Sequence, residues 1–313
     1  MDYKGRPEDQ LRLDLTEPFY LCRAEATKWE RYFSVYYHQA MIGFRHNEIG
    51  SLLPAGETPF WLKKDQTIQG GLALSSRALT YLFTIPPFKA DPEMVRMIAK
   101  ALQQIGGMEQ PFRALTIPDD DVDVYIRAGF RPDSGRFRWM QRPTSECSNV
   151  SSKHLTWRPA EIICEAGEPH LKLEREAGLF LFKHASESGN VKPPSSTFRQ
   201  MLHRLREYAA HSPKGVLEAS SFVFDDATHA LIGVCLIGSR GGFPTIDELA
   251  VLPAFKGRGV ATSMLQRALT VLAQNGEPLI RICIMHGHSL ESLCYRLGFM
   301  PGPPFLQGMT FDR

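Results

Sequence analysis

Hydrophobic and polar residues alternate along the chain with two periods, and they predict both strands and helices. In the second half, residues 246–252 are mostly apolar, which predicts a strand ending at Pro253. After Gly259 the apolar residues recur every three or four positions as far as Asn275-Gly276, which predicts an amphipathic helix. A β-rich apolar strand over 279–285 and a short helix over 289–297 follow.

The first half repeats this order. A strand over 78–85 stops at Pro86-Pro87, a helix runs from Asp91 to Gly106-Gly107, and a strand over 112–117 leads to a short helix over 119–127. Corresponding landmarks are separated by 253 − 86 = 167, 276 − 106 = 170 and 298 − 129 = 169 residues. Repeats of this length are typical of duplicated domains and not of solenoid units.

The pattern therefore predicts two α/β domains, over residues 1–143 and 154–313, joined by a polar linker over 144–153. The remaining predicted strands cover 60–64, 67–75, 135–142, 154–158, 221–224 and 231–237. The remaining predicted helices cover 29–42, 171–185 and 197–210, and residues 1–18 read as an irregular lead-in.

Composition narrows the class of protein. The chain has 313 residues, 43% of them hydrophobic, which is enough for two ordinary cores. A net charge of +2 argues against a nucleic-acid partner, and no apolar run is long enough to span a membrane. The start of the chain is charged and unlike a signal peptide, and six cysteines occur without a Cys-x-x-Cys pair. These features favour a cytoplasmic protein with reduced thiols and no bound metal.

The loop between the strand over 246–252 and the following helix is short, basic and rich in glycine. Gly257 and Gly259 let successive amide N–H groups turn inward, and the helix start adds its positive end. Lys256 and Arg258 add positive charge, so the loop is a candidate site for an anion such as phosphate. It is neither a Walker loop nor a dinucleotide fingerprint. The simplest alternative is an ordinary strand-to-helix turn.

Lys256, Gly259 and Ala261 resemble the acyl-CoA pyrophosphate loop of the GNAT acetyltransferases, with Lys in place of the usual Arg or Gln. The resemblance implies two GNAT-like α/β domains, each a mixed, largely antiparallel sheet flanked by helices. It also implies acetyl-CoA as co-substrate, held by the loop and by main chain before it. The implied residues are Leu249, Ala250, Val251 and Leu252 for the pantetheine arm, and Lys256, Gly257, Arg258, Gly259, Val260, Ala261 and Thr262 for the pyrophosphate.

Acyl transfer to an amine needs a base, because an ammonium is not a nucleophile. Several GNAT enzymes carry an acidic residue four positions before Val251, where this chain has Asp247, with Glu248 as the second choice. Strand alternation is expected to put Asp247 on the face of Leu249 and Glu248 on the opposite face. The alternative for Asp247 is a solvated charge at a strand end.

The family's usual acid for the departing thiolate is a Tyr four residues before the Gly of Gly-Phe. Here Cys294 takes that place and Tyr295 is one residue late, which is a rotation of about 100° on a helix. We expect Cys294 to face the CoA sulfur, and Tyr295 to pack in the core or to lie at an amphipathic surface position. Water, or Tyr295 after a local shift of the helix, would then be the proton donor. The family's Asn is replaced by Gly287, and the neighbouring His286 and His288 could relay a proton or cap the helix.

The first half has no equivalent loop. The segment between Pro86-Pro87 and the following helix contains no glycine, and Asp91 and Glu93 would repel a pyrophosphate. The sequence therefore predicts a degenerate first domain and a second domain that moves an acyl group from acetyl-CoA to a primary amine of a small molecule or of an amino acid or peptide. The alternative is a non-catalytic CoA-binding regulatory or interaction protein on the same scaffold. The acceptor and the oligomeric state are not indicated.

Overall fold

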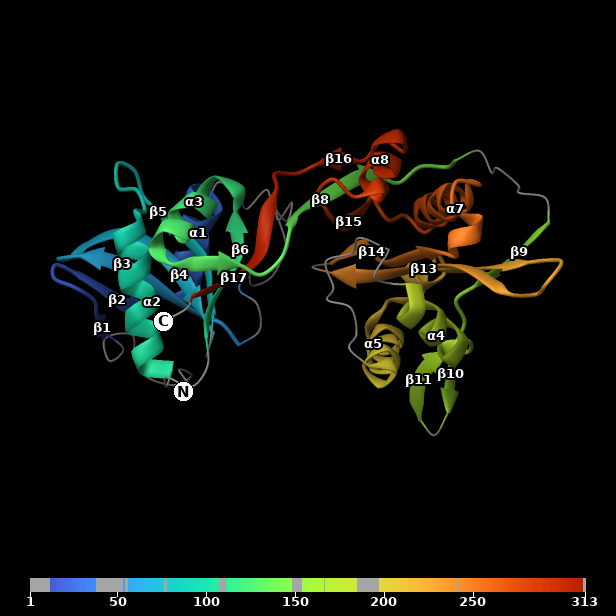
Figure 1. Ribbon diagram of the computed structural model, residues 1–313, viewed down its shortest axis with the longest axis horizontal. Helices are drawn as coiled ribbons and strands as arrows, with labels where there is room; N and C mark the ends of the chain where they lie inside the picture. The colour runs from blue at the N-terminus through green and yellow to red at the C-terminus, as the bar shows by residue number, and fades with distance from the viewer. Residues whose placement is uncertain are drawn as a thin grey trace. The chain divides into compact units, whose positions relative to one another are not determined.

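The structure, a computed structural model, describes residues 12–37, 53, 56–75, 78–106, 111–147, 154–165, 167–184, 197–240 and 242–311. The chain forms two compact units, coloured along the chain in Figure 1. Unit 1 comprises Met1–Arg138 together with Gly302–Arg313, and unit 2 comprises Trp139–Pro301.

Unit 1 is a mixed sheet with helices on both faces. Its strands, in spatial order, are β1 (Arg12–Asp14), β2 (Phe19–Arg23), β3 (Thr58–Lys64), β4 (Thr67–Leu74), β5 (Ala78–Thr84), β6 (Phe112–Pro118) and β17 (Phe305–Phe311), and β7 (Phe130–Pro132) pairs with β17. Only β5 and β6 are parallel. One core lies under α2 (Pro92–Gly106) and α3 (Val122–Ala128), and an aromatic cluster lies under α1 (Ala26–Tyr36) on the other face.

Unit 2 has the same plan. Its main strands are, in order, the end of β8 (Arg136–Pro143), β15 (Leu279–Met285), β14 (Phe243–Val251), β13 (Leu231–Arg240), β12 (Ser221–Asp225) and β9 (Leu155–Pro159), with β16 (Met300–Pro301) paired to β8. The helices α7 (Val260–Gln274) and α8 (Ser289–Arg296) cover one face, and α4 (Glu174–His184) and α5 (Phe198–His211) cover the other (Figure 1). A hairpin of β10 (Ile162–Glu165) and β11 (Glu168–Leu171) and the short helix α6 (Lys214–Leu217) complete it.

Local sequence explains where the main helices of unit 2 begin. Gly259 has φ +80°, a left-handed conformation that favours glycine, and the chain enters α7 at the next residue. The buried stripe of α7 is the predicted one: Val260, Met264, Leu265, Ala268, Leu269 and Leu272. Thr197 and Gln200 exchange hydrogen bonds in a capping box that starts α5.

The two repeats exchange their last strands. The C-terminal strand β17 pairs with β6 of unit 1, and the end of β8, which follows the first repeat in sequence, pairs with β15 of unit 2. The compact units therefore differ from the predicted domains, because residues 139–143 lie in unit 2 and residues 302–313 in unit 1. Local pattern cannot reveal this, since a strand reads the same whichever sheet it completes.

Most predicted elements are present, with a few differences. The helix predicted from residue 171 begins at Glu174, because Leu171 ends the hairpin strand β11. The predicted lead-in contains the short strands β1 and β2. Thr144 donates to main-chain carbonyls of Pro278 and Glu277, so the first residues of the predicted linker are held by unit 2; its residues 148–153 lie outside the described residues.

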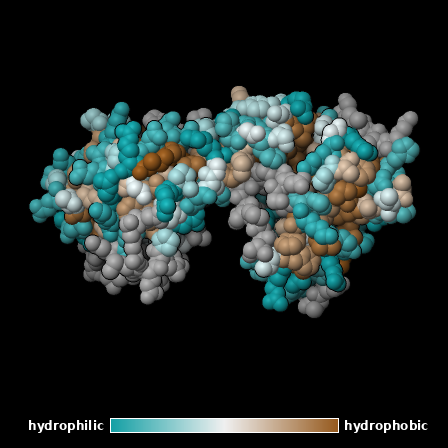
Figure 2. All heavy atoms as spheres, viewed as in Figure 1, coloured by the Kyte–Doolittle hydropathy of each residue, from teal (hydrophilic) through white to brown (hydrophobic). Residues whose placement is uncertain are grey.

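Figure 2 shows how hydrophilic and hydrophobic residues are distributed on one face of the molecule. On the face shown in Figure 2, hydrophilic side chains are spread over both units and the hydrophobic ones form separate patches. Within the described ranges, no helix is long and apolar enough to cross a bilayer.

Strand exchange predicts that a core substitution in the last strand damages the unit built from the start of the chain. Met309 on β17 is fully buried in the core of unit 1, and Met264 on α7 is fully buried in the core of unit 2. Either Met→Ala change should cost about 2–5 kcal/mol. By hydrogen exchange, Met309→Ala should lower amide protection in β3–β6 and Met264→Ala in β13–β15. Loss of amide protection in β13–β15 caused by Met309→Ala would contradict the strand exchange between the repeats.

Candidate active site

The glycine loop has the form expected of an anion site. Gly257 and Gly259 have φ values of +77° and +80°, and residues 256–259 are exposed. Five amide N–H groups of this loop and helix start donate no hydrogen bond to any described residue: those of Gly257, Gly259, Val260, Ala261 and Thr262. These donors lie at the positive end of the 15-residue helix α7, beside the exposed Lys256 and Arg258. The residues present therefore fit a pyrophosphate.

The strand that leads to this loop has one full partner and one partial partner. β14 is paired with β13 from Phe243 to Val251, but its recorded pairing with the parallel strand β15 is limited to Thr245 and Arg281. From Ile246 onward β14 and β15 diverge, which leaves one side of β14 without a neighbouring strand. An extended ligand arm could therefore pair with main chain around residues 249–252.

A β-bulge at Asp247 changes which way its side chain points. Leu236 pairs with Glu248 and Ile237 pairs with Ile246, so Asp247 is the extra residue of the bulge. Its carboxylate lies against Gly238 and lines a cleft with residues of α5. Glu248 bonds Arg204 of α5, so both carboxylates lie toward α5. The expected opposite faces are wrong, because regular alternation ignores the bulge.

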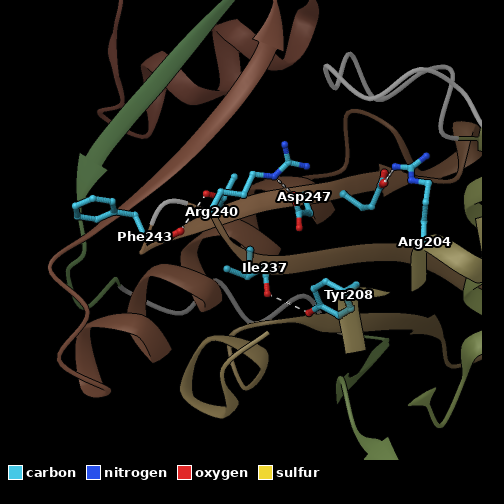
Figure 3. A network of polar contacts seen from close by, with 8 residues as sticks. Arg204, Tyr208, Ile237, Arg240, Phe243 and Asp247 are labelled. Atoms are coloured by element: carbon cyan, nitrogen blue, oxygen red, sulfur yellow. Dashed lines mark hydrogen bonds and ion pairs between the residues drawn. The ribbon is translucent and has the colours of Figure 1, made fainter. Parts of the chain in front are cut away.

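The cleft beside the bulge has a volume of about 510 Å³. Its polar walls come from α5, from the turn after it and from neighbouring strands: Arg204, Glu207, Tyr208, His211, Ser212, Ser239, Arg240 and Asp247. Asp247 Oδ1 accepts a hydrogen bond from Arg240 Nε at 2.9 Å, and the Asp247 side chain is only 12% exposed (Figure 3). The strand that leads to the loop therefore also places a partly buried, ion-paired carboxylate in this cleft.

Tyr208 forms the floor of this cleft. Its hydroxyl donates to the main-chain oxygen of Ile237 at 3.0 Å and lies 2.7 Å from Ser220 Oγ (Figure 3). Burial raises the pKa of Tyr208 well above its usual value, so the phenol stays neutral and serves as a fixed donor. Arg204, Tyr208 and His211 follow helical spacing on α5. That spacing was the signal in the sequence that could have indicated this wall of the cleft.

Glycine 238 makes room for the Asp247 carboxylate. A Cβ at this position would overlap Asp247 Oδ2, whereas Ser212 Oγ would lie 3.7 Å away. The bulge, the small residue and the Arg240 bond thus fix the carboxylate from three sides.

The two candidates for the thiolate acid lie in different environments. Cys294 is fully buried in the core with Leu290 and Leu293, and burial, with a smaller effect from Glu291, raises its pKa to about 12. Tyr295 is 47% exposed, so of the two expected positions it occupies the one at the surface. Adjacent residues on a helix are separated by a rotation of about 100°. Cys294 lies on the buried apolar face of α8, so Tyr295 is turned toward the surface. A buried thiol in the core is not placed to meet a ligand.

The two histidines before α8 have different partners. His288 Nδ1 accepts from the amide of Leu290 at 3.2 Å and caps the helix. His286 Nδ1 lies 3.3 Å from the buried carboxylate of Glu291, which also accepts from the amide of Gly287 at 2.6 Å. Capping therefore accounts for His288, and Glu291 fixes the turn at Gly287.

Unit 1 has the same bulge as unit 2, but different residues at the bulge and at the start of the next helix. A bulge in β5 sets Tyr81 and Leu82 against Leu72 of β4, about one repeat length before Asp247 and Glu248. Tyr81 is buried, with its ring centroid 5.1 Å from that of Phe33 and 5.7 Å from that of Tyr37. At the start of α2, Asp91 caps the amide of Met94 at 2.8 Å. Aromatic rings thus surround the position that corresponds to Asp247. The Asp91 carboxylate lies where unit 2 has its glycine loop.

Comparisons with known proteins agree with this geometry. Residues 187–299, within unit 2, match the acetyltransferase (GNAT) family model. A GCN5-related N-acetyltransferase from Sphaerobacter thermophilus has a similar fold, with a TM-score of 0.65 at 15% identity, covering 96% of this chain and 98% of that one. A tandem GNAT protein from the clavulanic acid biosynthesis pathway gives 0.54 at 10%, covering 93% and 98%. No curated protein sequence matches the chain.

At these identities the structures show a shared fold. The predicted fold class, two GNAT-like α/β units with mainly antiparallel sheets, is confirmed. The match of residues 187–299 to the family model supports acyltransferase activity in general. The described residues contain no cluster of three or more His, Cys, Asp or Glu that could hold a metal ion.

The site geometry predicts that Gly238→Ala lowers activity without unfolding the protein. The new methyl group must displace the Asp247 carboxylate, and a misplacement of about 1 Å at a reacting centre can cost about 10²-fold in rate. Gly215→Ala is the control, because its methyl group would meet only Asn275 at ordinary contact distances of 3.6 Å or more. Turnover and melting temperature are measured for both. Unchanged turnover in Gly238→Ala would show that the position of this carboxylate does not matter.

Proposed function

We propose that unit 2 is an acetyl-CoA-dependent N-acetyltransferase that acts on a primary amine. The observation that carries this proposal is that one strand serves both halves of the reaction. β14 leads through a 3-10 turn at Pro253–Phe255 to the glycine loop and, at its bulge, holds Asp247 in the polar cleft. Asp247 and the strand end at Val251 are four residues apart, roughly 13 Å of extended chain. An extended donor and an amine acceptor could thus meet along one strand.

Each group of the chain has a distinct role in this proposal. The amides of residues 257 and 259–262, with Lys256 and Arg258, would hold the pyrophosphate of the donor. Bound acetyl-CoA supplies an activated acyl group as its thioester. Asp247 would hold the acceptor's ammonium and take a proton from it, directly or through water, so that the nitrogen can form the new C–N bond as the C–S bond breaks. Main-chain N–H groups of β14 would polarise the carbonyl.

The proton for the departing thiolate would come from water or from Tyr295. Cys294 is unsuited, because it is buried and its raised pKa offers no advantage over the leaving thiol. Glu248 is held by Arg204 and is 6% exposed as a side chain, so it would keep the second-choice role. Unit 1 would bind no CoA and serve as a structural copy.

The competing function is a CoA-binding protein without catalysis, which the lack of the family's Tyr and Asn favours. Release of free thiol from acetyl-CoA, measured with pools of small amines, amino acids and peptides, separates the two. Amine-dependent thiol release is expected. CoA binding without release in every pool would favour the non-catalytic alternative.

CoA binding should depend on one glycine of the loop. Gly259→Asp puts a side chain and a negative charge into the phosphate site, so the thermal shift produced by CoA should disappear; for the parent protein at a hundred times Kd that stabilisation is about 2.7 kcal/mol. Gly276→Asp is the matched control, because its φ of +76° is equally unusual and it too has open space around it, at the other end of α7. Calorimetry should give one CoA per chain. Two per chain, or a persisting shift in Gly259→Asp, would contradict the single site.

Asp247→Asn should lower kcat/KM by about 10²- to 10⁴-fold, the usual effect of removing a general base. The loss should shrink as pH rises, because more of the acceptor is then already the free amine. CoA affinity should stay near that of the parent protein. Glu248→Gln tests the alternative carboxylate: a large loss there combined with a silent Asp247→Asn would assign the role to Glu248.

A further inference from the structure

Arg240, in the wall of the cleft, has hydrogen-bonding capacity that the protein does not use. It is the last residue of β13 and donates only its Nε–H, to Asp247. Its two Nη groups have no acceptor among the described residues, and the side chain is 43% exposed. The second arginine of the cleft differs, because Arg204 is 22% exposed and is already paired with the buried Glu248. Arg240 is therefore the guanidinium that faces the cleft with donors to spare.

Charge balance gives this arginine a role when an acceptor binds. In the protein alone, Arg240 and Asp247 compensate each other across 2.9 Å. An ammonium that approaches Asp247 shares its negative charge and leaves Arg240 undercompensated in a half-enclosed site. Like charges at close range repel, so a plain amine would bind against the field of the guanidinium. An anionic group on the same molecule would remove that penalty and accept from the free Nη groups.

We infer that the acceptor is an amine that carries an anionic group only a few bonds from its nitrogen, as an α-amino acid does. This inference rests on the proposed function and names the substrate class of the same site. Because Asp247 and Arg240 touch, the two groups that they would bind must also be close neighbours. The forked guanidinium fits a carboxylate with two parallel hydrogen bonds, and it would fit a phosphonate or phosphate in the same way.

The same reasoning disfavours two other classes of amine. Polyamines and aminoglycosides carry several positive charges and no anion, so each would add charge beside Arg240 and Arg204. The N-terminal amine of a peptide has an amide where an amino acid has its carboxylate. The remaining polar side chains at the cleft, Glu207 and His211, are then available to meet the side chain of the acceptor.

The test compares amines that differ only in the anionic group. Amino acids, their amides and the matching aminophosphonates are assayed for thiol release, and are titrated against the protein with and without CoA by thermal shift. Amides have the more acidic ammonium and hence more free amine at a given pH, so a preference for acids cannot come from the amount of free amine. We expect at least one amino acid to exceed its amide by tenfold or more in kcat/KM. A preferred phosphonate would assign the anion as a phosphate-type group.

Variants of Arg240 then decide whether this residue carries the preference. In Arg240→Gln the acid-to-amide ratio should fall tenfold to a hundredfold, and Arg240→Lys should retain part of it because it keeps the charge without the fork. Arg206→Gln is the control, since Arg206 lies on α5, is paired with Glu174 at 3.0 Å and does not line the cleft. Its ratio should equal that of the parent protein.

Failure of the inference is distinct from failure of the proposed function. Absence of CoA binding or of thiol release with every acceptor refutes the enzyme, while the titrations still report which amines bind. Equal stabilisation by acids and amides, or an acid preference that survives in Arg240→Gln, overturns the assignment of Arg240.

Discussion

The strands of unit 1 are completed by β17 from the end of the chain, and those of unit 2 by the end of β8, which follows the first repeat in sequence. β17 supplies Leu306, Met309 and Phe311 to the core of unit 1, and the end of β8 supplies Met140 to the core of unit 2. Without these strands, β6 and β15 would each lose a neighbour and expose unpaired main-chain groups. Neither repeat is therefore a complete folding unit by its own residues, and unit 2 depends on a strand that follows the first repeat in sequence.

Within unit 2, the functional geometry follows from how β14 is paired. Full pairing with β13 holds the strand in place, and divergence from β15 after Thr245 leaves its other side open. The bulge at Asp247 lies just where the divergence begins, and it turns a carboxylate toward α5 that would otherwise point into the α7 core. Gly238 provides the space and Arg240 the counter-charge. A small irregularity in one ladder thus creates the polar cleft.

The contrast between the units shows which features are architecture and which are chemistry. Unit 1 retains the parallel pair, its divergence after Thr80 and the bulge that follows, so these belong to the fold. What differs is the residue at the bulge and the start of the next helix. Tyr81 packs among aromatic rings, and Asp91 caps α2, whereas unit 2 has Asp247 in a cleft and open amides at α7. A few side chains therefore decide whether the space beside the bulge and the start of the next helix are filled or open.

The sequence alone determined the elements and the loop. The apolar stripe of α7 and the glycines at 257 and 259 are local properties, because helix periodicity and left-handed φ values depend on nearby residues only. The internal repeat likewise indicated two similar α/β units. Tertiary structure decided the rest. Strand exchange and the burial of Cys294 depend on packing between segments far apart in sequence, whereas the face of Asp247 and its contact with Arg240 depend on the register of the β13–β14 hairpin. A one-residue shift in a ladder or a helix redirects a side chain, and strand pairing and tertiary packing fix that shift.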